Sequence, residues 1–243
     1  MTLAVAGAAL IAGVLIGLTG IGGVLVVPAL TEFGGVPVDS AVAASMMGFL
    51  IGGTLAAAAH LRRVRVDGTR VAALALTAAV GAAAGTASLG LVPATALRLF
   101  IAFLSVASGL NALFDRRARP DNPLPPAAVL GASGLVVGMG SALSGTGGPV
   151  MLIPILLALR VPAPQAIALG LAAGVPIVFT ATAVNGIAGR LDYGLGLLLA
   201  VVIAAGTLAG SALSRRFSGR GLTCVVAAVL VMTGIWYAWV SVR

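Results

Sequence analysis

Long apolar runs of membrane-spanning length fill most of this sequence and constrain its fold more than any other feature. They cover residues 3–18, 40–59, 71–89, 97–114, 127–143, 165–187, 193–213 and 222–240. A helix of about 20 apolar residues crosses the hydrocarbon layer of a membrane, and most of these runs are close to that length. The mean hydropathy is +1.17, and 60% of the residues are hydrophobic. The sequence therefore predicts an all-α polytopic membrane protein.

Charged residues are few and lie between the apolar runs. Fourteen are basic against six acidic, and every basic residue is an arginine. Arginine-rich loops set the orientation of membrane proteins, so we interpret these residues as topology signals rather than a nucleic-acid surface. The sequence contains no phosphate-binding loop, and its one histidine, His60, and one cysteine, Cys224, make no metal-ligand cluster. We expect a lipid bilayer around the chain and no enzyme activity, metal, cofactor or nucleic-acid partner.

The two halves of the chain repeat each other at an offset of 125 residues. The matching pairs are Pro37 with Pro162, Arg65 with Arg190, Asp67 with Asp192, Gly81 with Gly206, Gly85 with Gly210 and Gly109 with Gly234. A polar linker rich in arginine and proline lies at 115–126. We predict a first membrane repeat at 1–114 and a second at 127–243, related by an internal duplication.

A glycine cluster interrupts the apolar pattern at the same place in each repeat. The first break is Thr19-Gly20-Ile21-Gly22-Gly23, and the second is Ser144-Gly145-Thr146-Gly147-Gly148. The apolar pieces that follow, 24–31 and 150–159, reach only about half of the bilayer at ~1.5 Å per residue. We interpret them as half-helices. Irregular backbone at membrane depth is tolerated where it is buried in protein or lines a watery cavity, so the two breaks predict a central site.

Arginine placement distinguishes two topologies. If the broken segments cross the membrane, nine arginines lie on one face and five on the other. If they are re-entrant hairpins, eleven lie on one face, and only Arg98, Arg190 and Arg243 lie opposite. The second division fits the positive-inside rule better. It predicts three transmembrane helices per half, inverted repeats, and both termini outside the cytoplasm, although residues 3–18 are long for a half-helix.

The glycine breaks are the candidate substrate site. The first amides of a helix lack intrahelical partners and carry partial positive charge, so two such ends that meet at the midplane bind an anion without a buried arginine. We assign this role to the backbone and hydroxyl groups of Thr19, Gly20, Gly22, Gly23, Ser144, Gly145, Thr146, Gly147 and Gly148. Other glycine pairs at four-residue spacing, such as Gly81 and Gly85, are better explained by close helix packing.

Four polar residues near helix ends or loops are candidates for ion coupling or gating. They are His60, Asn185, Glu32 and Asp39. His60 lies at the end of an apolar run and matches Asn185 in the other repeat. A structural role is the alternative for each, since a polar group at a helix end often makes an interhelical hydrogen bond.

The sequence resembles the sulfite exporter TauE/SafE family, also called the toluene-sulfonate uptake permease group. The resemblance lies in Gly20-Ile21-Gly22-Gly23 with Pro28-Ala29-Leu30, and in Gly145-Thr146-Gly147-Gly148-Pro149 with Pro154-Ile155-Leu156. Val24 departs from the pattern, because many members carry a third glycine there. The resemblance implies a multi-pass protein of the bacterial inner membrane that moves sulfite, sulfonates or related organosulfur anions.

The leading hypothesis is a secondary transporter that alternates access around the two glycine-rich helix tips. The nearest alternative is an anion channel, which could use the same helix ends. An intramembrane enzyme with Ser144 as nucleophile is a further alternative, but it needs a histidine partner and only His60 is available. The direction of transport, the coupling ion and the existence of a homodimer stay open.

Overall fold

The computed structural model describes residues 2–62, 64, 66–113, 124–214 and 220–242. All regular secondary structure in the described residues is helical, in agreement with the predicted class. The predicted linker at 115–126 lies outside the described residues as far as Pro123. The first half contains α1 (Leu3–Thr19), η1 (Gly23–Leu25), α2 (Val26–Glu32), α3 (Val38–Leu61), α4 (Gly68–Ser88), η2 (Leu89–Leu91) and α5 (Ala94–Leu113). The second contains α6 (Ala127–Ser144), α7 (Pro149–Ala158), α8 (Ala163–Ile187), α9 (Tyr193–Leu213) and α10 (Arg220–Val242).

Six helical segments are long and apolar enough to cross a membrane. They are α3, α4 with η2, Ala94–Asn111 of α5, α6, α8 and α9. Five of these correspond to predicted crossings, while α6 was predicted as the first arm of a hairpin. The sixth predicted crossing corresponds to α10, which is 23 residues long and contains the shorter apolar stretch Ala227–Val242. Both glycine breaks interrupt the helical pattern where the sequence placed them.

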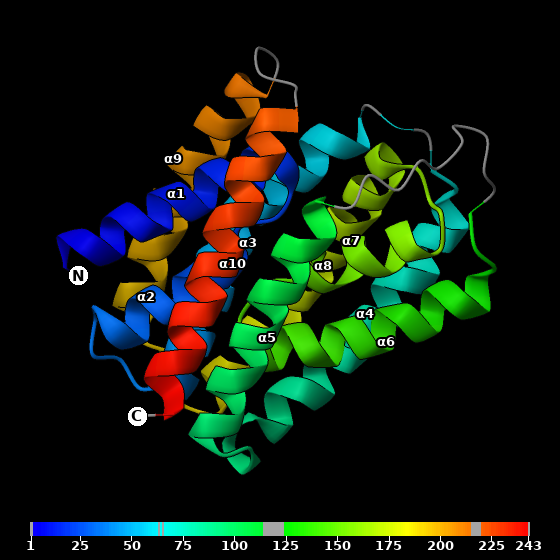
Figure 1. The fold of residues 1–243 in the computed structure, drawn as a ribbon. Coiled ribbons are helices and arrows are strands. Elements are labelled where there is room, and N and C mark those ends of the chain that lie inside the picture. Colours follow the sequence, from blue (N-terminus) through cyan, green and yellow to red (C-terminus); the bar gives the residue numbers. More distant parts are fainter. Residues whose placement is uncertain (1, 63, 65, 114–123, 215–219, 243) are drawn as a thin grey trace.

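The two halves are interleaved rather than separate. The most extensive helix contacts pair α4 with α6, α5 with α10, α1 with α9, α3 with α9, α3 with α8, and α4 with α8. Every one of these pairs joins one half to the other, and Figure 1 shows α4 beside α6 and α1 beside α9. The same set of pairs results when each helix is replaced by the helix at the matching position of the other half, 125 residues away: the α4–α6 pair corresponds to α9–α1, and α3–α9 corresponds to α8–α4. The chain therefore forms one body around a common interior.

Close glycine contacts give the relative directions of the paired helices. In α4 and α6, a Cβ at Gly81 would overlap the carbonyl oxygen of Leu135, and one at Gly85 would overlap that of Met139. Both residue numbers increase together, so these helices run parallel. In α5 and α10, a Cβ at Gly109 would lie 2.8 Å from Ala227 O, and one at Gly234 would lie 2.8 Å from Ala102 O. The counterpart helices α5 and α10 therefore run antiparallel.

The first broken segment folds back on itself. The hydroxyl of Thr2, which caps α1, donates to the carbonyl oxygen of Phe33, just after α2, over 3.2 Å. The beginning of α1 and the end of α2 thus lie at the same end of the molecule, on the left in Figure 1 near the C-terminal end of α10. This is the geometry of a hairpin whose tip is the glycine break.

The close contact between α4 and α6 requires glycine, so a larger residue there should lower the stability of the protein. Gly138→Ala should destabilise the protein by about 1–3 kcal/mol, because the added methyl would meet the backbone of Ala78 and Ala82. Gly131→Ala on the same helix is the matched control. Its methyl would lie 3.6 Å from the nearest atom, Thr77 Cγ2, and alanine favours a helix by up to about 1 kcal/mol over glycine. Thermal unfolding in detergent measures both, and equal melting temperatures would contradict the close contact.

Candidate functional site

The first break is an ordered turn at the end of α1. Gly20 adopts the left-handed conformation, with φ 77°, and its amide donates to Ile16 O over 2.9 Å. The Thr19 hydroxyl donates to Leu15 O over 2.9 Å and accepts from the Ile21 amide over 3.3 Å. The hydroxyl of Thr19 therefore fixes the turn that carries Gly22 and Gly23 into the next helix.

The second break depends on glycine at three positions. Gly145, Gly147 and Gly148 have φ values of 69°, 78° and 111°, a region that side chains with a Cβ rarely adopt. Pro149 then begins α7, where its missing N–H costs nothing. The hydroxyls of Ser144 and Thr146, both buried, lie 2.9 Å apart within hydrogen-bond distance.

The two breaks meet in the interior. A Cβ at Gly23 would lie 2.6 Å from the carbonyl oxygen of Thr146, and one at Gly145 would lie 2.6 Å from Val27 Cγ2. Ser45 of α3 donates its hydroxyl to Gly145 O over 3.1 Å and so ties the second break to the first half. The glycines that the sequence assigned to two separate turns thus belong to one buried cluster.

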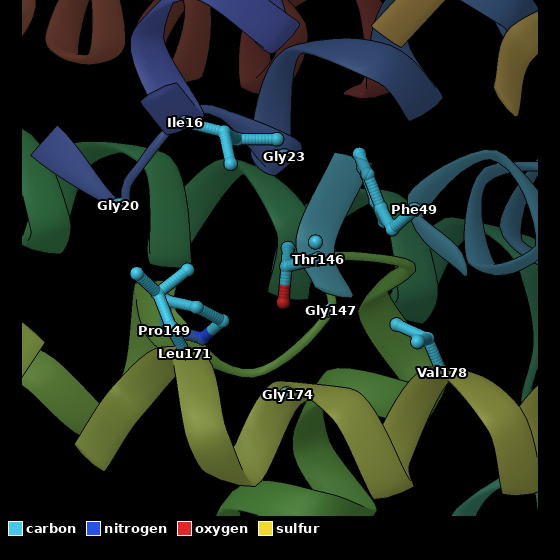
Figure 2. Close-up of a pocket in the computed structure, with 11 residues that line it drawn as sticks. Ile16, Gly20, Gly23, Phe49, Thr146, Gly147, Pro149, Leu171, Gly174 and Val178 are labelled. Atoms are coloured by element: carbon cyan, nitrogen blue, oxygen red, sulfur yellow. The ribbon is translucent and has the colours of Figure 1, made fainter. Parts of the chain in front are cut away.

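A small cavity lies where the breaks meet. Its volume of about 20 Å³ is close to the space that a single water molecule needs. In Figure 2 the Thr146 hydroxyl lies among the lining residues, between Pro149 and Val178. The lining residues are Ile16, Gly20, Gly23, Phe49, Gly53, Thr146, Gly147, Pro149, Leu171, Gly174 and Val178. Of the predicted site residues, four border the cavity: Gly20, Gly23, Thr146 and Gly147. The other five belong to the same two breaks but do not line it: Thr19, Gly22, Ser144, Gly145 and Gly148.

The lining from α3 and α8 is asymmetric, and the sequence reasoning missed it. Phe49 of α3 is 3% exposed, and its ring faces both Gly23 and Gly147. Its counterpart at the offset of 125 is Gly174, and the counterpart of Gly53 is Val178. A large side chain in one half is matched by glycine in the other at both positions. The offset contained this signal, because those four residues align.

The site offers hydrogen-bond donors and no charged side chain. None of the lining residues is acidic or basic. Within the described residues, no partner is found for the amides of Gly147 and Gly148, which precede the first turn of α7. An N-terminal helix end attracts negative charge. No group of three His, Cys, Asp or Glu side chains that could hold a metal occurs in the described part of the chain.

The four candidates for coupling or gating lie away from the cavity. Glu32 pairs with Arg98 over 3.3 Å at the end of α2, and Asp39 lies in the first turn of α3. His60 lies in the last turn of α3, with its Nδ1 3.0 Å from Ala56 O. Asn185 is buried near the end of α8. None of the four lines the cavity, so a coupling role for them stays a prediction.

The sequence matches the model of the "Sulfite exporter TauE/SafE" family over residues 5–237. That range covers both glycine breaks and all but the ends of the first and last helices. The chain belongs to this family. It is also 26% identical over 245 residues to the "Probable membrane transporter protein YjnA" of Bacillus subtilis (strain 168), a match that covers 93% of this chain and 95% of that protein. No solved structure matches.

Family membership and the apolar helices together establish the general class. The protein is an integral, multi-pass membrane transporter of the TauE/SafE family. The relative from Bacillus subtilis is described only as a probable membrane transporter, so it names no substrate.

Proposed function

We propose that the protein is a secondary transporter of a small anion, with an organosulfur oxyanion such as sulfite or a short sulfonate as its substrate. The observation that carries this proposal is the meeting of the two glycine breaks in the interior, with Gly23 against the carbonyl of Thr146. The family name supports the organosulfur class.

Backbone and hydroxyl donors explain how such a site would hold an oxyanion. The unpaired amides of Gly147 and Gly148 and the hydroxyl of Thr146 are donors, and the N-terminal end of α7 adds a partial positive charge. A fixed carboxylate beside them would repel an anion, and the lining contains none. A site without arginine binds weakly enough to release its ligand on the other side.

The size of the cavity favours alternating access over an open channel. A volume of about 20 Å³ holds one water and is too small for an oxyanion with several heavy atoms. The helices that meet here, α3 and α8 with the two broken segments, must part before substrate enters. An enzyme is disfavoured as well, because the Ser144 hydroxyl pairs with Thr146 and His60 lies at the end of α3.

We further propose that the halves are inverted repeats with two re-entrant hairpins. Three observations support this: the antiparallel direction of α5 and α10, the exchange of contacts between the halves, and the hydrogen bond from Thr2 to Phe33. A homodimer stays a prediction.

This topology places both termini on the face opposite the arginine-rich loops. A reporter enzyme that is active only outside the cytoplasm should therefore be active when it is fused after Arg243. The matched fusion joins the same reporter within the linker at 115–126, which belongs to the opposite face. A cytoplasmic C-terminus would contradict the inverted arrangement.

Thermal stability against a panel of anions tests the proposed substrate class. The panel contains sulfite, sulfate, methanesulfonate, sulfoacetate, taurine, acetate and chloride, each added to the solubilised protein. A ligand at about 100 times its Kd should stabilise the folded state by ~2.7 kcal/mol. We expect this shift with sulfite or a sulfonate and not with chloride. A shift with none of the anions would count against an anionic substrate.

A further inference from the structure

A second group of donors lies at the far end of α8, away from the central cavity. The Arg190 side chain, just beyond this helix, donates from Nε to Asn185 Oδ1 over 3.0 Å. Its terminal nitrogen donates to the carbonyl oxygen of Thr86, in the last turn of α4, over 2.7 Å. The guanidinium group thus joins the loop after α8 to the end of α4.

Two side chains in this group keep polar atoms that the described protein leaves unpaired. Asn185 and Thr86 are both 0% exposed. Asn185 Nδ2 and Thr86 Oγ1 have no hydrogen-bond partner among the described residues. A buried donor without a partner is costly, and nearly all such groups in folded proteins are satisfied. The unpaired amide belongs to the same carboxamide whose oxygen accepts from Arg190 Nε, so the unpaired donor lies beside the guanidinium.

Arg190 brings a positive charge that no described carboxylate neutralises. The ion pairs found in the described chain join Arg70 to Asp67 and Arg98 to Glu32. The guanidinium of Arg190 uses Nε and one terminal nitrogen for its two hydrogen bonds. The other terminal nitrogen lies near Gly90, where an added Cβ would come within 3.4 Å of it. A planar guanidinium suits an oxyanion, because it presents parallel N–H groups to two oxygens.

One face of α8 leads from the cavity to this group. Leu171, Gly174 and Val178 line the cavity, and Thr182 and Asn185 continue the same spacing of three and four residues. Thr182 also has a buried, unpaired hydroxyl. From Gly174 to Asn185 the helix rises about 16 Å. Two of the three unpaired polar atoms of α8, those of Thr182 and Asn185, therefore lie between the central cavity and the end of the molecule that carries Arg190, while the third, Gln165 Oε1, lies near the start of the helix.

We propose that Arg190, Asn185 and Thr86 form a second anion-binding site, which holds a singly charged oxyanion at the membrane face that contains the chain termini. Arg190 supplies the charge, and the Asn185 amide and Thr86 hydroxyl supply neutral donors. The site captures the anion before it enters the central cavity or after it leaves, so this role rests on the proposed transport function. The binding itself does not depend on transport.

Fluorine NMR of trifluoromethanesulfonate tests the site, because it detects binding of a sulfonate without any transport. The protein is placed in lipid nanodiscs and the anion titrated. Thr86→Val should weaken the binding about tenfold, with an unchanged or higher melting temperature, because the lost hydroxyl has no protein partner. Asn185→Asp should weaken it at least tenfold, because a carboxylate would pair with Arg190 and repel the anion.

Arg70→Gln is the matched charge control, since it removes one arginine at the opposite end of α4 and should change binding less than twofold. Wild-type affinity in both Thr86→Val and Asn185→Asp would overturn the proposed site. Loss of all binding in Gly148→Val, with both of those variants unaffected, would place the only anion site at the glycine breaks and would also overturn it. Binding that depends on Thr86 and Asn185, in a protein that moves no anion across liposomes, would support this site and refute the proposed transport function.

Discussion

Gly148→Val should abolish anion transport while the protein remains in the membrane. Gly148 has φ 111°, which a β-branched residue cannot adopt without strain. A Cβ there would also lie 3.0 Å from Gly174 Cα and 3.1 Å from Ile177 Cδ1. The second break would have to move away from α8, and Thr146 and Gly147 would no longer line the cavity as they do now. Uptake into proteoliposomes should fall by a factor of about 100 or more, as expected when a binding constellation is misplaced by about 1 Å.

Gly35→Val is the matched control for backbone strain. Gly35 also has a positive φ, 64°, but a Cβ there meets nothing within 4 Å. The control should keep most of its transport at a small cost in stability. Thr146→Val separates binding from folding, because it replaces a hydroxyl with a methyl group of similar size. Thr146→Val should weaken substrate binding without unfolding the protein. Full transport by Gly148→Val would contradict the placement of the site.

Phe49→Ala should both destabilise the protein and widen its substrate range. Phe49 is 3% exposed, and its ring lies where a Cβ at Gly23 or Gly147 would come within 3.0 or 3.1 Å. Removing a buried phenylalanine side chain costs about 3–5 kcal/mol. The space it leaves adjoins the cavity, so the affinity for bulky sulfonates should rise relative to the affinity for sulfite. Thermal unfolding and competition between sulfite and benzenesulfonate measure the two effects.

Phe103→Ala on α5 is the matched control for that change. Phe103 is 65% exposed on the outer surface of the helix bundle, so its removal leaves no internal cavity. Phe103→Ala should change the melting temperature, and the competition between sulfite and benzenesulfonate, much less than Phe49→Ala does. Equal effects of the two substitutions would mean that the Phe49 ring does not limit the space at the cavity.

Much of the architecture could be predicted from local sequence. The apolar runs gave the helices, and the run predicted at 3–18 is observed as Leu3–Thr19. The half-helix predicted at 150–159 is observed as Pro149–Ala158. Glycine clusters end helices because they permit left-handed backbone, and Gly20, Gly145, Gly147 and Gly148 all adopt it. These are properties of short segments, which a sequence shows directly.

The contents of the site were less predictable, because they depend on which helices meet. Phe49, Leu171 and Val178 look like ordinary membrane residues in the sequence, and only the packing of α3 against α8 brings them to the breaks. Thr19 and Ser144 show the converse. Substrate binding by both stays a prediction. The Thr19 hydroxyl donates to the carbonyl oxygen of Leu15 in α1, and the Ser144 hydroxyl lies 2.9 Å from that of Thr146. The residue type alone did not reveal that local hydrogen bonds would occupy them.

The cluster at Arg190 illustrates the same limit for charged residues. Sequence reasoning used this arginine to match the two repeats and to count positive charges on each face, and assigned it no binding role. Its contact with Thr86 spans 104 residues of sequence, and the unpaired amide of Asn185 becomes evident only when the neighbours of α8 are known. Long-range polar contacts of this kind have no periodic signature in a sequence.

Sulfite uptake into proteoliposomes that contain the purified protein tests the central claim most directly. Wild-type protein should give saturable uptake that methanesulfonate inhibits and chloride does not. Gly148→Val should reduce the rate to that of protein-free liposomes, while Gly35→Val retains it. Uptake that rises linearly with sulfite, or that is equal in wild type and Gly148→Val, would contradict a sulfite transporter that binds its substrate where the two glycine breaks meet.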